Sequence, residues 1–327
     1  MRRTWISFAS QSLIAGSIAL SSALFTTACR DDADTTSSSS SGASTSSSTG
    51  SGAGGGGTAL KILNWNLHNF YDDKDNGSMT GEIVKSSADY KAQTALIAKV
   101  IGALDPDVAI LQEVENQGAL DTLNTALGNK YPERSLIEGN DTRGINNAAL
   151  SKIPFAKVVS HKDDQFVEAG SGQTFSFTRD AIEYHFSFAG RSVALVGVHF
   201  RSKVDPDNPN KRLAEAERAR AIADEITKAD AETGVVILGD YNDTPNSDPM
   251  TAIKGKAPNL YADSATFVPT ADQWSFDFMG TKELIDHQMA NPVMSEFVEK
   301  DTATIVHSKD VDDASDHSPM MITYLVK

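Results

Sequence analysis

Short apolar runs recur along this 327-residue chain, and several of them end in polar side chains. The run Val-Val-Ile-Leu at residues 235–238 predicts a buried strand, which Gly239 is expected to break. Asp240 and Asn242 follow two residues apart, so in an extended backbone their side chains would leave on one face. Gly, Asp and Asn are also ordinary turn residues, so this stretch alone favours a polar cleft and a plain turn about equally.

The same pattern predicts the other elements of the chain. Further strands are expected at residues 60–66, 108–113, 147–151, 193–200, 284–289 and 320–325, with a strand pair within 175–188. Apolar positions at helical spacing predict helices at residues 86–104, 118–127 and 211–229. The third helix is expected to be scaffold with a solvated charged face. Strands and helices alternate without a break after residue 60, which indicates one α/β domain at residues 58–327.

Residues 1–29 predict an export signal. Arg2 and Arg3 give a basic start, and residues 6–25 are apolar and rich in small residues. Such a segment is typical of a signal peptide rather than a membrane-spanning helix. The two arginines leave twin-arginine export open as an alternative to the general route.

Cys29, the single cysteine, excludes an intramolecular disulfide and a cysteine-rich zinc site. Small residues precede it, as in bacterial lipoprotein signals, although Thr26 stands where an aliphatic residue is usual. Residues 30–57, rich in Ser and Gly, predict a flexible linker. We therefore expect an exported protein anchored to an envelope membrane through a lipid at Cys29, with plain secretion as the alternative.

The chain carries a net charge of −15, and its 40% of hydrophobic residues can form a sizeable core. An acidic chain is repelled by polyanions at long range. This argues against a protein that binds nucleic acid stoichiometrically. It leaves open an enzyme that handles phosphate through a bound metal ion.

Polar or ionisable residues stand at the ends of several predicted strands. Because ligands of open α/β sheets bind beyond the strand ends, these residues are expected to share one rim. They are Asn66, Glu113, His199, Asp240, Asn242, Asp286, Asp316 and His317.

Five motifs containing these residues resemble the endonuclease/exonuclease/phosphatase superfamily, which includes DNase I, in their order along the chain. The motifs are Asn-Trp-Asn at 64–66, Gln-Glu-Val-Glu-Asn at 112–116, Gly-Asp-Tyr-Asn-Asp at 239–243, Ile-Asp-His at 285–287 and Ser-Asp-His-Ser-Pro at 315–319. The match covers about residues 60–325, and connecting stretches resemble a secreted bacterial nuclease-type branch. The resemblance implies a two-sheet β-sandwich flanked by helices, in four layers, as one catalytic domain.

The resemblance also implies a metal site. Glu113 would be the principal ligand of Mg²⁺ or Mn²⁺, helped by Asn66 and, in some states, by Asp316. Hard divalent cations take oxygen ligands and retain water, which this set allows. The metal would stabilise charge on the phosphate oxygens. A structural Ca²⁺ is a further expectation.

The resemblance implies catalytic roles for five more residues. His317 would contact the phosphate and help to activate the attacking water, with Asp286 fixing its ring. Asp240 would position or deprotonate that water, and Asn242 would hydrogen-bond the phosphate. His199 would donate a proton to the leaving group, although the residues alone favour a structural strand-end histidine.

Arg143 and Arg179 are expected either to clamp phosphate or to form ordinary salt bridges. The related branch has an acid that could orient the second histidine where this chain has Asn147. Without that acid the His199 cation would be less stable. His287 is expected to be structural.

The leading hypothesis is a metal-dependent phosphodiesterase that hydrolyses nucleic acid, DNA above all, by in-line water attack. A phospholipid or sphingomyelin phosphodiesterase, or an inositol or sugar phosphatase, is the alternative on the same scaffold. A surface binding protein with an inactive site is disfavoured, because the full residue set is present. Lipid-acting members expose apolar loops, and residues 274–278 are expected to be the edge of a core strand instead. No protein partner is predicted.

Overall fold

The computed structural model describes residues 56–75, 83–204 and 206–327. The predicted signal peptide, its Cys29 and the linker up to residue 55 lie outside these residues. No helix in the described ranges is long and apolar enough to cross a membrane.

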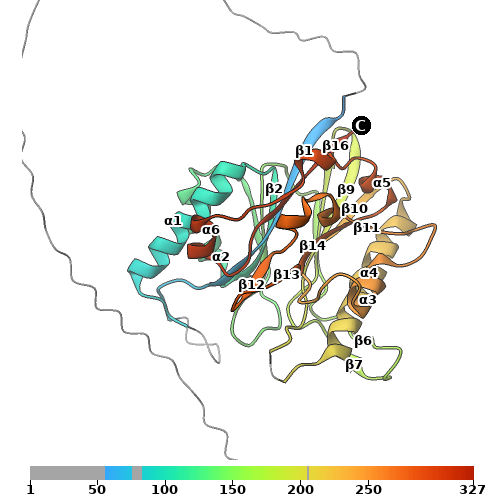
Figure 1. Cartoon of the computed structure of the whole chain (residues 1–327), viewed down its shortest axis with the longest axis horizontal. Coiled ribbons are helices and arrows are strands. Elements are labelled where there is room, and N and C mark those ends of the chain that lie inside the picture. Colours follow the sequence, from blue (N-terminus) through green and yellow to red (C-terminus); the bar gives the residue numbers. More distant parts are fainter. Residues whose placement is uncertain (1–55, 76–82, 205) are drawn as a thin grey trace, which may run out of the picture. The chain divides into compact units, whose positions relative to one another are not determined.

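Two six-stranded mixed sheets form the centre of the unit that spans Gly54–Lys327 (Figure 1). The first contains, in spatial order, β15 (Thr304–Ile305), β16 (Met320–Val326), β1 (Thr58–Phe70), β2 (Val108–Val114), β4 (Asn146–Ser151) and β3 (Glu133–Leu136). The second contains β11 (Ala262–Asp263), β14 (Asp286–Ala290), β10 (Gly234–Asp240), β9 (Arg191–His199), β8 (Ile182–Phe188) and β5 (Lys157–Ser160). Two small hairpins pair β6 (Phe166–Val167) with β7 (Thr174–Phe175) and β12 (Phe276–Phe278) with β13 (Thr281–Glu283).

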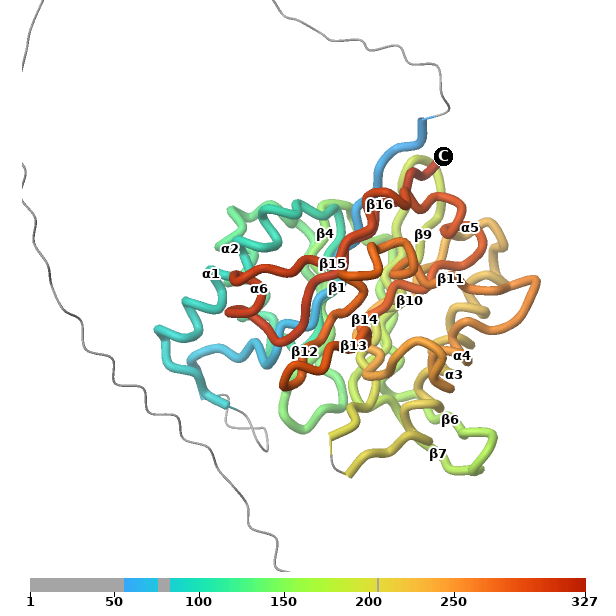
Figure 2. The backbone as a smooth tube through the Cα atoms, in the orientation of Figure 1, coloured from blue at the N-terminus to red at the C-terminus, as the bar shows by residue number. Residues whose placement is uncertain are grey.

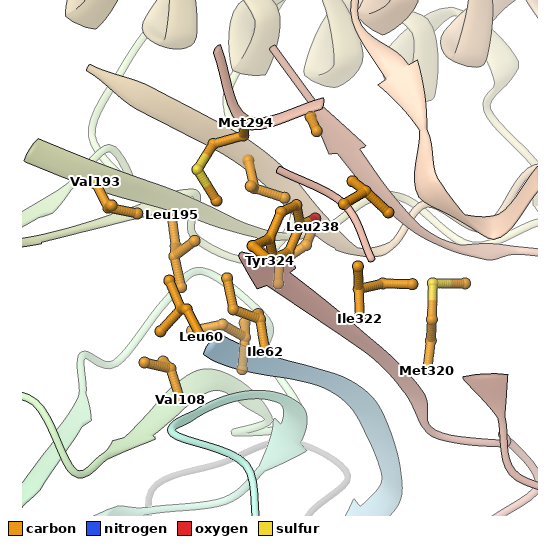
Figure 3. Packing of buried hydrophobic residues seen from close by; sticks show 14 of the residues in the cluster. Leu60, Ile62, Val108, Val193, Leu195, Leu238, Met294, Met320, Ile322 and Tyr324 are labelled. Carbon is orange, nitrogen blue, oxygen red and sulfur yellow. The ribbon is translucent and has the colours of Figure 1, made fainter. Parts of the chain in front are cut away.

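The two sheets pack face to face through the first of three apolar clusters that the described residues form. In Figure 3, Ile62 and Ile322 of the first sheet approach Leu195 and Leu238 of the second. Successive residues of β1 alternate between this core and the opposite face, where Leu63 belongs to a second cluster. Both faces of the central strands are therefore buried.

Helices cover the outer face of each sheet. The first sheet is covered by α1 (Ser87–Leu104), α2 (Gln117–Ala126) and α6 (Lys309–Ala314), and the second by α3 (Pro209–Ala229) and α4 (Asp248–Lys254). The remaining helices are α5 (Pro292–Ser295) and the 3₁₀ turns η1 (Ser264–Phe267), η2 (Thr270–Asp272) and η3 (Lys300–Thr302). The predicted two-sheet sandwich flanked by helices is confirmed, as are its three long helices.

Several local predictions were wrong. Gly239 does not break its strand, because it pairs with His287 inside β10. It has φ +150°, and a Cβ there would lie 1.9 Å from the carbonyl oxygen of Val198.

The side chain of Asn242 does not share a strand face with that of Asp240, because Asn242 has φ +51°. No strand pair lies within residues 175–188, since β7 pairs with β6, and β8 pairs with β5 and β9.

The charged residues of α3 also differ from the prediction of a solvated face. Arg212 and Glu215 are 3% and 0% exposed. The Glu215 carboxylate accepts hydrogen bonds from the Thr178 N–H and hydroxyl and from the Arg201 N–H, each at 2.6 Å. Buried charges of this kind are stable only when they are paired, and here they tie α3 to the loops beside the strand ends.

The first residues of β1 lie beside the last residues of β16, with Thr58 opposite Val326 (Figure 2). Asn66 lies further along β1, where the strand no longer pairs with β16. The chain therefore enters this unit at the end of β1 away from Asn66.

Candidate active site

The polar strand ends meet at one edge of the two sheets. In the second sheet Asp240 lies directly opposite His199 of β9 on one side and Asp286 of β14 on the other. In the first sheet Asn66 lies opposite Gln112, the neighbour of Glu113. The parallel pairs β1–β2 and β9–β10 bring these ends to the same edge, as expected for parallel strands.

The Asp240 carboxylate connects the two sheets. Its Oδ2 accepts a hydrogen bond from Asn66 Nδ2 at 3.0 Å and lies 3.3 Å from His199 Nε2. The same oxygen lies 3.9 Å from His317 Nε2. Its Oδ1 accepts the N–H of Asn242 at 2.8 Å, which holds Asn242 in its left-handed conformation.

His317 is held by Asp286. Its Nδ1 donates to Asp286 Oδ2 at 2.7 Å, and its ring packs on Phe276 with centroids 4.9 Å apart. The hydrogen bond directs Nε2 toward Asp240. The indole N–H of Trp65 donates to the His317 carbonyl at 2.8 Å, which fixes the loop on β1.

The three central groups have perturbed pKa values. Burial lowers the pKa of His317, but the Asp286 and Asp240 carboxylates outweigh it and raise this pKa to about 10. Burial raises the pKa of Asp240 to about 7, against the opposing effect of the His317 cation. Burial, with Arg179 as the largest of the nearby cations, lowers the pKa of His199 well below its usual value. His317 is therefore a cation at neutral pH, whereas His199 is neutral.

Among the described residues, His199 Nδ1 has no acceptor for the second ring proton that its cation would carry. This buried nitrogen has no hydrogen-bond partner in the part of the chain that the structure describes. Asn147, which the sequence resemblance places where a related branch has an acid, donates to the Asp180 carbonyl at 2.6 Å. A neutral His199 with a free Nδ1 is a donor through Nε2, toward Asp240.

Glu113 lies at an irregularity of β2. It has φ +62°, and the pairing of β2 with both of its neighbours shifts register around it. Its Oε2 accepts the Asn69 N–H at 2.7 Å, and its Oε1 lies 3.9 Å from His199 Nε2. His68 and Asn69 are left-handed too, with φ 49° and 51°. Such strained residues cluster where a bulge redirects a side chain toward a site.

Two sets of residues could hold a cation. Asp240, Asp286 and His317 offer atoms within 4.8 Å of one another, but the Asp286–His317 hydrogen bond already uses two of those groups. The carboxylate of Glu113 and the Asn66 Oδ1, whose protein donor is the His68 N–H, are oxygens with remaining lone pairs. This second set fits a hard divalent cation that keeps several waters.

The remaining predicted site residues lie around this centre. Asp316 is at the surface, with Oδ1 3.5 Å from His68 Nδ1. Arg143 and Arg179 both pair with Asp141 Oδ2, each at 2.9 Å. Arg179 is 3% exposed, whereas the Arg143 side chain is 40% exposed and can reach a ligand. Both arginines therefore form salt bridges.

His287 and residues 274–278 flank the site. His287 is structural, as predicted, since it is fully buried with Nδ1 2.9 Å from Asp263 and Nε2 3.1 Å from the Asp243 carbonyl. Residues 274–278 are not the edge of a core strand. They enter the β12–β13 hairpin, where Phe278 is 60% and Met279 91% exposed. The sequence pattern missed this because Phe-Asp-Phe alternates as a half-buried strand does.

Comparison with known proteins agrees with this architecture. Residues 61–259 match the family model of the Endonuclease/Exonuclease/phosphatase family. No curated protein matches. A solved endonuclease/exonuclease/phosphatase from Bacteroides vulgatus is 16% identical, with 83% of this chain and 100% of that chain covered and a TM-score of 0.57.

Two eukaryotic structures are similar as well. The human Nocturnin catalytic domain, solved with a bound sulfate anion, is 14% identical, with 81% and 94% of the two chains covered and a TM-score of 0.59. Truncated Caenorhabditis elegans TDP2 is 16% identical, with 82% and 98% covered and a TM-score of 0.54. At these identities the likeness shows the fold, and the predicted DNase I-like sandwich is confirmed.

Proposed function

Because this chain belongs to the endonuclease/exonuclease/phosphatase family, whose members hydrolyse phosphoester bonds, we propose that it is a metal-dependent phosphodiesterase that cleaves nucleic acid, with DNA as the expected substrate. The observation that carries the proposal is the convergence of His199, Asp286 and His317 on the single carboxylate of Asp240.

The protonation states support a division of roles. A carboxylate with a pKa of about 7 suits a general base, so Asp240 would take the proton of the attacking water. The His317 cation would donate through Nε2 to a phosphate oxygen, with Asp286 holding its ring. His199, being neutral, would orient Asp240 rather than protonate the leaving group.

Glu113 and Asn66 would hold the divalent cation, Mg²⁺ or Mn²⁺. Asp316 would assist them from beside His68, whose N–H donates to Asn66 Oδ1. When bound, the cation supplies positive charge to the phosphate and to the departing oxygen. Asn242 would hydrogen-bond the phosphate, from a position beside Arg179, since both side chains donate to the Phe200 carbonyl.

A substrate panel tests the proposal on residues 54–327, which form one compact unit. Plasmid DNA, single-stranded DNA, RNA, sphingomyelin and inositol phosphates are incubated with Mg²⁺ or Mn²⁺, with and without chelator. We expect DNA cleavage that chelator stops. Glu113→Ala and His317→Ala should each abolish it while circular dichroism shows a folded chain, and Lys157→Ala, an exposed residue of β5, serves as control. Full activity of either site variant would overturn the assignment.

The β12–β13 hairpin favours a second candidate, a phospholipid or sphingomyelin phosphodiesterase. Its apolar tip, Phe278 and Met279, is exposed, and its first residue Phe276 forms a backbone bridge to His317. An apolar tip beside a phosphodiesterase site could enter a lipid surface. Double substitution of the tip by serine should then lower vesicle binding and sphingomyelin hydrolysis. Absence of sphingomyelin hydrolysis by the unaltered protein would exclude this candidate.

We also propose export and lipid anchoring at Cys29, supported by the sequence of residues 1–29. Labelled-lipid incorporation into the full chain should occur and should be lost in Cys29→Ser. Absence of label on the unaltered chain would refute the anchor.

A further inference from the structure

A pocket of about 520 Å³ lies beside the candidate active site, lined by four basic side chains against the single carboxylate of Asp141. The four are Arg143, Arg179, Arg201 and Lys211, and we name the hollow they line the basic pocket. The chain as a whole has a net charge of −15, so this concentration of positive charge runs against its composition. A concave positive surface attracts and concentrates anions.

The basic pocket adjoins the candidate active site. Arg179 Nη1 and Asn242 Nδ2 donate to the same oxygen, the Phe200 carbonyl, at 2.9 and 3.1 Å. Arg179 belongs to the pocket and Asn242 to the proposed phosphate contacts, so the two sites share a wall. A molecule with its reacting phosphate at Asn242 would extend into the basic pocket on this side.

The positive charges of the pocket are only partly neutralised by the protein. Asp141 pairs with Arg143 and with Arg179. Among residues 56–75, 83–204 and 206–327, no carboxylate lies within 4.0 Å of the charged side-chain nitrogens of Arg201 or Lys211. The Arg201 guanidinium donates through Nη2 to the Pro206 carbonyl at 2.9 Å. Glu215 holds the Arg201 N–H at 2.6 Å and so fixes the backbone from which this side chain starts.

Lys211 occupies a position that its own helix disfavours. It is the third residue of α3, whose N-cap is Asn208 and whose first turn holds no acid. The N-terminal end of a helix carries partial positive charge and repels a cation. Burial also lowers the pKa of Lys211. The Glu215 and Asp141 carboxylates act against this lowering without reversing it, and a ligand anion in the basic pocket would add to their effect.

We propose that the basic pocket binds a second, non-scissile phosphate of the substrate, one nucleotide away from the bond that is cleaved. This inference rests on the proposed phosphodiesterase function and adds the requirement for a neighbouring phosphate. The volume of the pocket accommodates a nucleoside phosphate rather than a bare anion. The phosphate could be an internal diester or a terminal monoester, since both present the same anionic oxygens.

Short oligonucleotides separate these sources. The kcat/KM of the full chain is measured for a thymidine dinucleotide with one internal phosphate, for the same molecule with an added terminal phosphate at either end, and for the trinucleotide. A trinucleotide with one uncharged methylphosphonate beside the cleaved bond preserves the shape and removes the charge. We expect a charged neighbour on one side to raise kcat/KM about tenfold or more, as for a hydrogen-bonded ion pair.

Lys211→Gln and Arg201→Gln should reduce that ratio of kcat/KM values toward one. Lys228→Gln is the matched control, because it removes one lysine charge from the last turn of the same helix, outside the basic pocket. Equal ratios in Lys211→Gln, Arg201→Gln and the unaltered chain would overturn the proposal. So would a ratio near one in the unaltered chain while it cleaves the simple dinucleotide.

Two further measurements keep the test decisive. If no oligonucleotide is cleaved, the proposed function fails, and calorimetric binding of thymidine 5′-phosphate in chelator still tests the pocket. Weaker binding by Lys211→Gln than by Lys228→Gln supports it, and equal binding overturns it. We expect the thermal midpoint of Lys211→Gln to equal or exceed that of the unaltered chain, because the substitution removes a cation that the helix dipole disfavours. If Lys211 instead served only to stabilise the fold, its removal would lower the midpoint.

Discussion

Glu113 is held in a backbone conformation that its residue type disfavours, and this makes a prediction about stability. Its φ of +62° lies in the left-handed region, inside a strand whose pairing shifts register on both sides. This conformation costs an L-residue with a Cβ roughly 1–2 kcal/mol, whereas glycine adopts it freely. Glycine has its own cost of about 0.5–1 kcal/mol through the entropy of the unfolded chain.

Glu113→Ala and Glu113→Gly isolate the strain. Both variants lose the carboxylate and its hydrogen bond to the Asn69 N–H, so that loss cancels in the comparison. At the midpoints of these two ranges, Glu113→Gly should be more stable than Glu113→Ala by about 0.75 kcal/mol. At Lys157, exposed in β5 and not among the residues of positive φ, the order should reverse, with alanine about 0.5–1 kcal/mol more stable than glycine.

The measurement is urea unfolding of all four variants, with equal slopes required so that only stability is compared. Added Mg²⁺ should stabilise the unaltered protein, by about 2.7 kcal/mol at one hundred times its dissociation constant. Neither Glu113 variant should respond, and both should be inactive. An alanine-over-glycine order at both positions would refute the strain, and an undiminished Mg²⁺ response would show that Glu113 does not hold the metal.

Three other substitutions have expected outcomes. Asp286→Asn removes the carboxylate that raises the pKa of His317, so the alkaline limb of the pH–rate profile should move to lower pH. If this limb does not move, His317 does not act as a cation. Burial raises the pKa of Asp180 from 3.8 to about 6, so its ionisation disfavours the folded state as pH rises through this window. Asp180→Asn should therefore stabilise the protein at pH 7 by about 2–3 kcal/mol but not below pH 4, as urea unfolding at the two pH values would show. Gly239→Ala places a Cβ 1.9 Å from the Val198 carbonyl oxygen and should cost about 3 kcal/mol; near-normal thermal stability would exclude that clash.

The sheets and the long helices could be predicted because their apolar periodicity is local. The conformation of the strand ends could not. Asn242 is left-handed because the Asp240 carboxylate accepts its N–H. Gly239 continues its strand through its pairing with His287 and Val198, where the Val198 carbonyl oxygen leaves no room for a Cβ. The first cause is a contact between a side chain and the backbone, and the second is a contact between strands that are far apart in the chain. Neither kind of contact leaves a pattern in the sequence.

The burial of charged residues in α3 could not be predicted for the same reason. Periodicity marks apolar faces, and it predicted a solvated charged face for the third helix. Glu215 of this helix is buried instead, against partners at residues 178 and 201. The family resemblance assigned the proposed catalytic roles through the five motifs but gave no role to Lys211, which these motifs do not include. A lysine in the first turn of a helix without acids was the available sign, since it opposes the helix dipole.

The two flanks of the active site differ in chemistry, and this difference separates the candidate substrates. On the side of Asn242 lies the basic pocket, and on the side of His317 lies the hairpin with its exposed Phe278. A phosphodiester lipid such as sphingomyelin carries one phosphate, so it would use the apolar flank and leave the basic pocket without an anion. A nucleic acid presents a second phosphate on one side and a base that can stack on an aromatic ring on the other. Dependence of kcat/KM on a neighbouring phosphate, lost in Lys211→Gln, would therefore favour the nucleic acid over the lipid as well as test the pocket.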